Sequence, residues 1–239
     1  MFPYTDMSTS AICNAIQLAL EPWADPARAQ GMAAYMKGHF SYMGIATPQR
    51  RAAVAAVMRE LKSASAKELL AIADALWRLP HREYQYVAID ILSKYSRSLG
   101  SKDVPHLLTL AQKKSWWDSV DGLSGAIRDI LQCELPSNGK VQVIMDEALE
   151  HSDLWVRRIA MIHQLGWRDD TNTERLFRYA KQLAHEQEFF IRKAIGWALR
   201  DYAWHDAGMV AGFLEENKAQ LSALTYREAG KHLERLQTG

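Results

Sequence analysis

The chain has 239 residues, of which 29 are Lys or Arg and 28 are Asp or Glu, giving a formal net charge of +1 at pH 7. A hydrophobic content of 48% excludes intrinsic disorder. The 13 Gly and 7 Pro are too few for the many turns of a β-sandwich or barrel, and two cysteines provide neither a disulfide framework nor a metal finger. The composition therefore favours an all-α, cytoplasmic protein without a membrane-spanning helix. We also expect a monomer that uses no metal or cofactor. The near-neutral charge leaves nucleic-acid binding open, because binding depends on where the charges lie.

Apolar residues recur at helical spacing along almost the whole chain, and no strand-like alternation appears. Residues 1–25 are expected to form an amphipathic helix and a linker. Thr47 before Pro48 is typical of an N-cap followed by proline at the first helical position. One buried helix face is predicted from an apolar stripe made of Tyr84, Val87, Ala88 and Ile91. Turn signals divide the rest of the chain, so we expect about a dozen helices, most of about 10 to 18 residues.

A weak repeat underlies the helical pattern. Similar aromatic-basic-apolar segments start 33 to 38 residues apart, near Tyr84, Trp117, Trp155, Phe190 and Tyr226. This period is typical of helical solenoids with two helices per repeat. The sequence therefore predicts a single domain, 1–239, built as a right-handed-type solenoid of HEAT-like (ARM/HEAT) helix pairs, C-shaped with a concave binding groove.

The basic residues follow the same period. Arg157, Arg192 and Arg227 are spaced 35 residues apart, and Arg158, Lys193 and Lys231 accompany them. Pairs at 50–51 and 113–114 precede them in the chain. If equivalent positions point the same way, these cations line one groove that suits the DNA backbone. The alternative is that they are solvated ends of surface helices.

The segment 114–121, KSWWDSVD, is the most unusual in the chain. Ser115 is predicted to be an N-cap with Asp118 as its capping-box partner, which leaves Asp121 unexplained. Trp117 and Asp121 are four residues apart and share a helix face. An indole and a carboxylate together suit an electron-poor sugar. The alternative is a core tryptophan beside an aspartate in a salt bridge.

A second segment, 189–200, places Gly196 inside a strong helix pattern. Glycine there costs about 1 kcal/mol relative to alanine, so we expect a neighbouring element to approach closely. Trp197 beside it is either core packing or a second aromatic wall. Arg157 and Arg158 are expected to point to different faces, while Trp116 and Trp155 are expected to pack between repeats. We expect four other candidates to be unremarkable, as helix residues (His163 and His185) and small core residues (Cys13 and Cys133).

Several blocks, in order along the chain, resemble the DNA alkylation repair family, whose bacterial members include alkylpurine DNA glycosylases. The most specific is 114–121. The others are Tyr35-Met36-Lys37, His39-Phe40, Gly44-Ile45, Thr47-Pro48, Arg50-Arg51, Leu79-Pro80, Arg82-Glu83, Phe189-Phe190-Ile191, Lys193 to Trp197, Arg227-Glu228-Ala229 and Lys231-His232. The resemblance is colinear from about residue 26 to residue 235.

The resemblance implies HEAT-like repeats around duplex DNA and hydrolysis of the N-glycosidic bond of cationic purines such as 3-methyladenine and 7-methylguanine. It implies that Trp117, Asp121 and Trp197 form the catalytic cleft, that Arg158 contacts phosphate and that Tyr35 lies near the DNA. We add further DNA-binding candidates: Thr47, Arg51, Lys114, Arg192, Lys193, Arg227 and Lys231. Ala46 departs from the family, whose members carry Gln before the Thr-Pro turn, and loss of that amide is expected to weaken lesion handling or alter the substrate range.

An alkylated purine already carries positive charge, so its glycosidic bond breaks without a general acid, and one carboxylate suffices. The expected partner is double-stranded DNA containing alkylated bases, with the protein on the nucleoid when bound. Two alternatives remain open. One is a non-catalytic HEAT-repeat protein that recognises distorted or branched DNA, and the other is a protein scaffold whose binding would be insensitive to salt.

Overall fold

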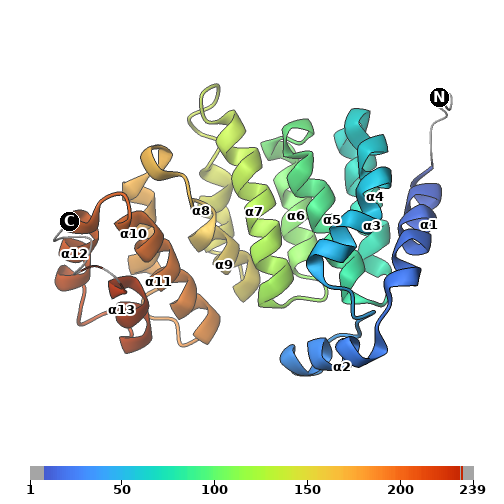
Figure 1. Ribbon diagram of the computed structural model, residues 1–239. Coiled ribbons are helices and arrows are strands. Elements are labelled where there is room, and N and C mark those ends of the chain that lie inside the picture. The colour runs from blue at the N-terminus through green and yellow to red at the C-terminus, as the bar shows by residue number, and fades with distance from the viewer. Residues whose placement is uncertain (1–7, 232, 234–239) are drawn as a thin grey trace. The chain divides into compact units, whose positions relative to one another are not determined.

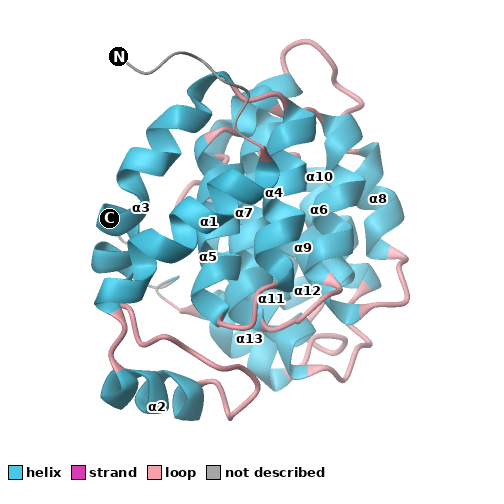
Figure 2. Ribbon diagram, turned by 90° about the vertical axis from the view of Figure 1, so that its right-hand side faces the viewer, coloured by secondary structure: helices cyan, strands magenta, loops and turns pink. Residues whose placement is uncertain are grey.

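The computed structural model describes residues 8–231 and 233, and it divides the chain into two compact units, 1–110 and 111–239. Within the described residues the regular structure is helical throughout, with no β-strand (Figure 2). The all-α prediction is confirmed. None of the described helices is both long and apolar enough to cross a membrane. His232, part of one block of the resemblance, lies outside the described residues.

The first unit contains six α-helices among its described residues (Figure 1). They are α1 (Thr9–Leu20), α2 (Pro26–Tyr35), α3 (Thr47–Glu60), α4 (Ala66–Arg78), α5 (Arg82–Lys94) and α6 (Val104–Ala111), which ends at the boundary between the units. Short 3-10 turns follow α1, α3 and α5 at Glu21–Trp23, Leu61–Ser63, Ser96–Ser98 and Ser101–Asp103. Helix α1 packs on α3 and α4, and α5 packs on α3 and α4.

The second unit contains seven α-helices among its described residues. They are α7 (Trp117–Glu134), α8 (Val143–Leu149), α9 (Leu154–Ile162), α10 (Thr173–Gln182), α11 (Phe189–Ala203), α12 (Ala207–Glu216) and α13 (Ala223–Gly230), with a 3-10 turn at Arg168–Asp170. Helix α9 packs on α7, α8 and α11, and α11 packs most extensively on α13. The last turn of α9 ends on a buried polar network of His163, Gln142 and Gln164.

The repeated segments all fall in the first turn of alternate helices. Each lies in α5, α7, α9, α11 or α13, and one further helix separates each of these from the next. The observed order therefore has the two helices per repeat that the spacing predicts. The HEAT-like assignment and the single domain 1–239 stay predictions.

Helix α1 confirms the described part of the N-terminal prediction. Its buried side chains recur at helical spacing, namely Ile12, Cys13, Ile16 and Leu20. The stripe predicted for α5 is also buried, with Tyr84 at 5% exposure and Val87, Ala88 and Ile91 at 0%. Apolar spacing alone therefore located the buried face of α5, and the amphipathic character expected near the N-terminus is found in α1.

Two N-cap predictions are wrong by one residue. Helix α3 has Ala46 at its N-cap and Thr47 as its first helical residue, without a side-chain cap. Helix α7 has Trp116 at its N-cap, again without a side-chain cap, because Trp116 is extended with φ −162° and ψ 161°. Ser115, the predicted N-cap, therefore lies one residue before the N-cap position, and its hydroxyl does not cap the helix.

A buried carboxylate holds the loop before α3 instead of a cap. Glu83 accepts hydrogen bonds from the backbone amides of Met43, Gly44 and Ile45 at 3.0, 2.9 and 3.2 Å. Gly44 has φ +87°, and a Cβ there would lie 2.0 Å from the Asp25 carbonyl oxygen. Only glycine fits this position, so the loop can lie directly against the start of α2.

Of the four residues expected to be ordinary helix or core residues, three differ from the prediction. His163 follows the last residue of α9, and His185 lies in an exposed turn after α10, so neither is within a helix. Cys13 is buried as predicted, whereas Cys133 is exposed. Cys133 lies off the buried stripe of α7, which includes Ile127, Ile130 and Leu131.

Candidate functional site

Asp121 and Arg158 form a bidentate ion pair that joins two helices of the second unit. Arg158 Nε, on α9, donates to Asp121 Oδ1 at 2.7 Å, and Nη2 donates to Oδ2 at 2.8 Å on α7. The arginine side chain is 1% exposed and the aspartate side chain 24%. A parallel pair of charge-assisted hydrogen bonds fixes the carboxylate plane as well as its position. Asp121 is therefore fixed by an ion pair between α7 and α9, while part of its side chain stays exposed to solvent.

The third guanidinium nitrogen ties the pair to α11. Arg158 Nη1 donates to the carbonyl oxygen of Phe190 at 2.6 Å. All three guanidinium nitrogens thus have acceptors within the second unit. Arg158 was expected to contact phosphate, and in this structure its donors point at Asp121 and the α11 backbone. The salt bridge that was left open as the alternative for Asp121 is therefore present, whereas its partner, 37 positions along the chain, was not predicted.

An aromatic cluster supports the carbonyl that Arg158 binds. The Phe190 ring lies 5.3 Å from Trp116 and 4.9 Å from Trp155, and the two indoles are 5.9 Å apart between centroids. Trp155 is 8% exposed. Trp116 and Trp155 therefore pack as predicted, while the part played by Phe190 was missed because its apolar character does not distinguish it from a core residue.

Trp197 is the second predicted cleft residue that the structure brings to Asp121. Both border a cavity of about 80 Å³, together with Ser124, Gly125 and Arg128. This volume has room for water and is well below the range of about 300–1,000 Å³ typical of pockets that enclose a ligand. Trp117, the third cleft residue, is half-buried one helical turn before Asp121. The site therefore presents an edge to a ligand rather than an enclosed pocket.

Two cations lie beside the Trp197 ring. The Arg158 Cζ atom is 5.1 Å from the ring centroid, and Lys193 Nζ is 5.4 Å away. Each cation is paired in turn with a carboxylate, Asp121 for Arg158 and Glu228 for Lys193. The indole is thus held by cation–π contacts on well-anchored side chains.

The periodic cations of the second unit are mostly ion-paired or hydrogen-bonded. Arg157 binds both oxygens of Glu186, at 2.6 and 3.1 Å, so it points away from Arg158 as expected. Arg192 donates to the Glu186 carbonyl at 2.9 Å and also binds Gln187. Arg227 is exposed. Two members of the series therefore fix the turn before α11, which the spacing alone did not indicate.

The predicted DNA-binding residues of the first unit lie near its surface. Tyr35 ends α2 with 73% exposure and borders a cavity of about 330 Å³ with Tyr42 and Tyr86. Thr47 is exposed at the start of α3. Arg51 is 64% exposed and bonded to Asp90 at 2.9 Å. Lys114, at the start of the second unit, is exposed in a turn with φ +52°.

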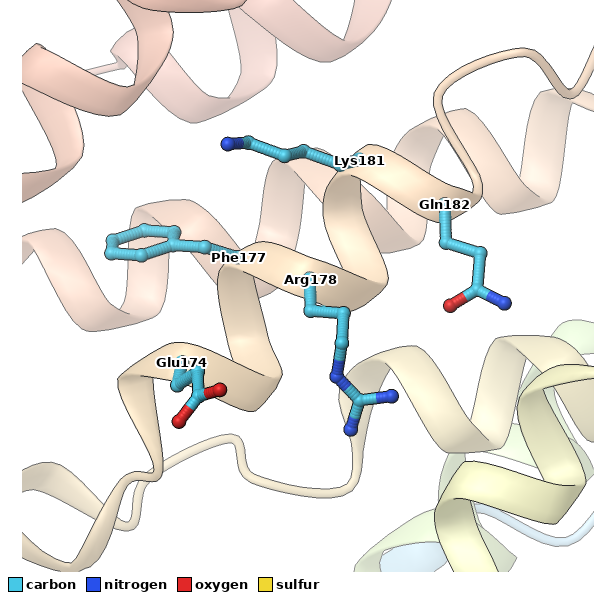
Figure 3. Close-up of a pocket in the computed structure, with 5 residues that line it drawn as sticks. All are labelled: Glu174, Phe177, Arg178, Lys181 and Gln182. Carbon is cyan, nitrogen blue, oxygen red and sulfur yellow. The ribbon is translucent and has the colours of Figure 1, made fainter.

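A cavity of about 620 Å³ lies against α10 and contains none of the predicted site residues. Its lining side chains spread outward from that one helix (Figure 3): Glu174, Phe177, Arg178, Lys181 and Gln182. Arg178 is already bound to Asp146 at 2.5 Å. Among the described residues there is also no cluster of His, Cys, Asp and Glu that could hold a metal ion.

Comparison with known proteins decides the family. The family described as DNA alkylation repair enzyme matches residues 16–233, a range that contains Asp121, Arg158 and Trp197. The chain belongs to this family. The resemblance of the sequence blocks to it is confirmed, and with it a role in DNA repair.

Solved structures agree with this membership. A predicted DNA alkylation repair enzyme from Enterococcus faecalis is 31% identical, with a TM-score of 0.83 over 88% of this chain and 96% of that one. The protein smu.31 from Streptococcus mutans UA159 shares the fold at 19% identity, with a TM-score of 0.60 over 91% of this chain and 98% of that one. Among curated protein sequences there is no significant match.

Proposed function

We propose that this member of the DNA alkylation repair family is a DNA glycosylase. It hydrolyses the N-glycosidic bond of cationic alkylated purines, 3-methyladenine and 7-methylguanine, in duplex DNA. The observation that carries the proposal is the Asp121 carboxylate, held rigidly by Arg158 and bordering the same cavity as Trp197. A fixed, partly exposed carboxylate is suited to a positive charge that develops during a reaction.

The chemistry follows from the charge of the substrate. The bond between the sugar C1′ and the purine nitrogen breaks, and its electron pair leaves with the base, which becomes neutral. The remaining sugar is an oxocarbenium ion, and the Asp121 carboxylate stabilises it. Water then adds to C1′, and its proton passes to Asp121 or to solvent. No general acid is needed, because the purine is already cationic.

The surrounding residues position this step. Arg158 holds both Asp121 oxygens, so the carboxylate does not need to reorganise when charge develops at the sugar. Trp197 and Trp117 flank the sugar with electron-rich ring faces. The cavity of about 80 Å³ is too small to enclose a purine nucleoside, so the lesion is attacked at its sugar while the base stays outside.

The test is release of free base from a duplex that carries 3-methyladenine or 7-methylguanine. We expect the native protein to release methylated purine and the Asp121→Asn variant to release none above the spontaneous rate, while both bind the duplex. Binding without base release by the native protein would instead favour a non-catalytic protein that recognises distorted or branched DNA. Salt-insensitive binding of a protein partner, with no DNA binding, would favour a scaffold.

A further inference from the structure

Glu228, on α13, is a buried carboxylate that binds three cations. Its side chain is 6% exposed. Lys193 Nζ and Arg200 Nη1 contact Oε2 at 3.1 and 3.0 Å, and Lys231 Nζ contacts Oε1 at 2.8 Å. The hydrogen bond from Lys231, with a further one from Lys193, lowers the pKa of Glu228 to about 2. Three positive charges therefore share one negative charge at neutral pH, and the cluster carries surplus positive charge.

The close packing of α13 on α11 fixes the position of this carboxylate. A Cβ at Gly196 would lie 2.5 Å from the Glu228 Cβ and 3.2 Å from the Thr225 carbonyl oxygen. The Thr225 hydroxyl also donates to the Arg192 carbonyl at 3.1 Å. The glycine in α11 thus permits a close approach, as its sequence context predicts, and Glu228 is placed where that approach is tightest.

The lysines, in contrast, keep access to solvent. The Lys193 side chain is 21% exposed and that of Lys231 is 45% exposed, while the carboxylate behind them is almost fully covered. Lys193 Nζ also lies 5.4 Å from the Trp197 ring centroid. The exposed side of the cluster therefore adjoins the wall of the proposed cleft.

We propose that Glu228 is a positioning residue that arranges Lys193 and Lys231 as a clamp for one backbone phosphate of bound DNA. The clamped phosphate lies beside the nucleotide whose sugar contacts Trp197, so this inference rests on the proposed function. Two ammonium groups held on the two oxygens of one carboxylate are oriented before DNA arrives. Their surplus charge is neutralised when a phosphodiester replaces counterions. The competing explanation is that the cluster only joins α11 to α13.

The two explanations predict opposite effects of Glu228→Gln on DNA affinity. The substitution raises the net charge by one, so a cluster that only joins helices leaves binding unchanged or tightens it. Loss of a preorganised clamp weakens binding by about fivefold, the equivalent of one hydrogen-bonded contact. The slope of log K against log salt also becomes shallower by about 0.9, the contribution of one phosphate.

The experiment measures binding of the full chain to a lesion-free duplex at several salt concentrations. The matched control is Glu215→Gln, which removes the same charge from an exposed acid 3.9 Å from Lys218, and which we expect to leave affinity and slope unchanged. Lys231→Gln is a second variant, which changes a side chain that is 45% exposed and leaves Glu228 paired with Lys193 and Arg200, and it should reproduce the loss in slope. The double variant Lys193→Gln/Lys231→Gln should lose no more slope than about one phosphate contact.

Tighter or unchanged binding by Glu228→Gln, with a normal slope for Lys231→Gln, would overturn the clamp. If Glu228→Gln does not fold, the clamp is tested by the salt slopes of Lys231→Gln and of the double lysine variant, and slopes equal to that of the native protein refute it. The lesion-free duplex keeps this test separate from the glycosylase proposal. If the native protein releases no base, the glycosylase proposal is refuted and the binding result is unaffected. If base release is normal and the variants keep the salt slope of the native protein, only the clamp is refuted.

Discussion

Removal of the charge on Asp121 has a consequence for stability as well as for activity. The Asp121→Asn variant leaves the Arg158 guanidinium, 1% exposed, without its anion. Breaking a buried ion pair in this way costs about 3–5 kcal/mol. We expect the lower end, about 3 kcal/mol, because Asp121 is 24% exposed and an asparagine still accepts one hydrogen bond. For a chain of 239 residues that unfolds as one unit, this loss lowers the melting temperature by about 6–12 °C.

A compensating variant separates stability from chemistry. In Asp121→Asn/Arg158→Gln both charges are removed together, so no unpaired charge remains in the interior. We expect the double variant to be more stable than Asp121→Asn alone and equally unable to release methylated purine. The measurements are urea unfolding followed by circular dichroism, and base release at a temperature where every variant is folded.

Two results would refute this reasoning. If Asp121→Asn unfolds at the same urea concentration as the native protein, the ion pair does not carry the stability assigned to it. If the double variant regains base release along with its stability, Asp121 acts only as a structural partner of Arg158. Stability restored without activity is the outcome that the proposed chemistry requires.

Two further predictions concern packing and pH. Gly196→Ala should destabilise the second unit by about 1–3 kcal/mol, because the new Cβ meets Glu228, whereas Gly212→Ala, with open space around it, should stabilise α12 by up to about 1 kcal/mol. Equal stability of the two variants in urea would contradict the close approach. Burial lowers the pKa of His163 from 6.5 to about 4. The neutral ring is therefore favoured in the folded state, and stability should be full above pH 6.5 and lost as the pH falls toward 4, by roughly 3 kcal/mol. His163→Gln should flatten this dependence in urea titrations, and an unchanged pH profile would exclude His163 as its source.

Much of the fold could be predicted because it depends on local periodicity. The apolar stripe predicted for α5 is buried where the spacing places it, and α1 is the amphipathic helix expected near the N-terminus. The close approach of α13 to Gly196 could also be predicted, because glycine destabilises a helix and is expected there only where a neighbouring element needs the space. The N-cap residues of the helices were predicted less accurately. Ser115 has the composition of an N-cap, but the extended backbone of Trp116 moves the cap one residue later.

The sequence alone determined the helical class, the alternation of two helices per repeat and the family, because these depend on patterns within or between neighbouring segments. It also singled out Asp121 and Trp197, which the structure brings to one cavity. Only the tertiary structure decided which acid each cation meets. Arg158 binds Asp121 across 37 residues and Lys193 binds Glu228 across 35, so no local spacing encodes either pair. The residue type determines only the sign of a charge. The packing of helices that are distant along the chain determines which ion-pair partner it meets.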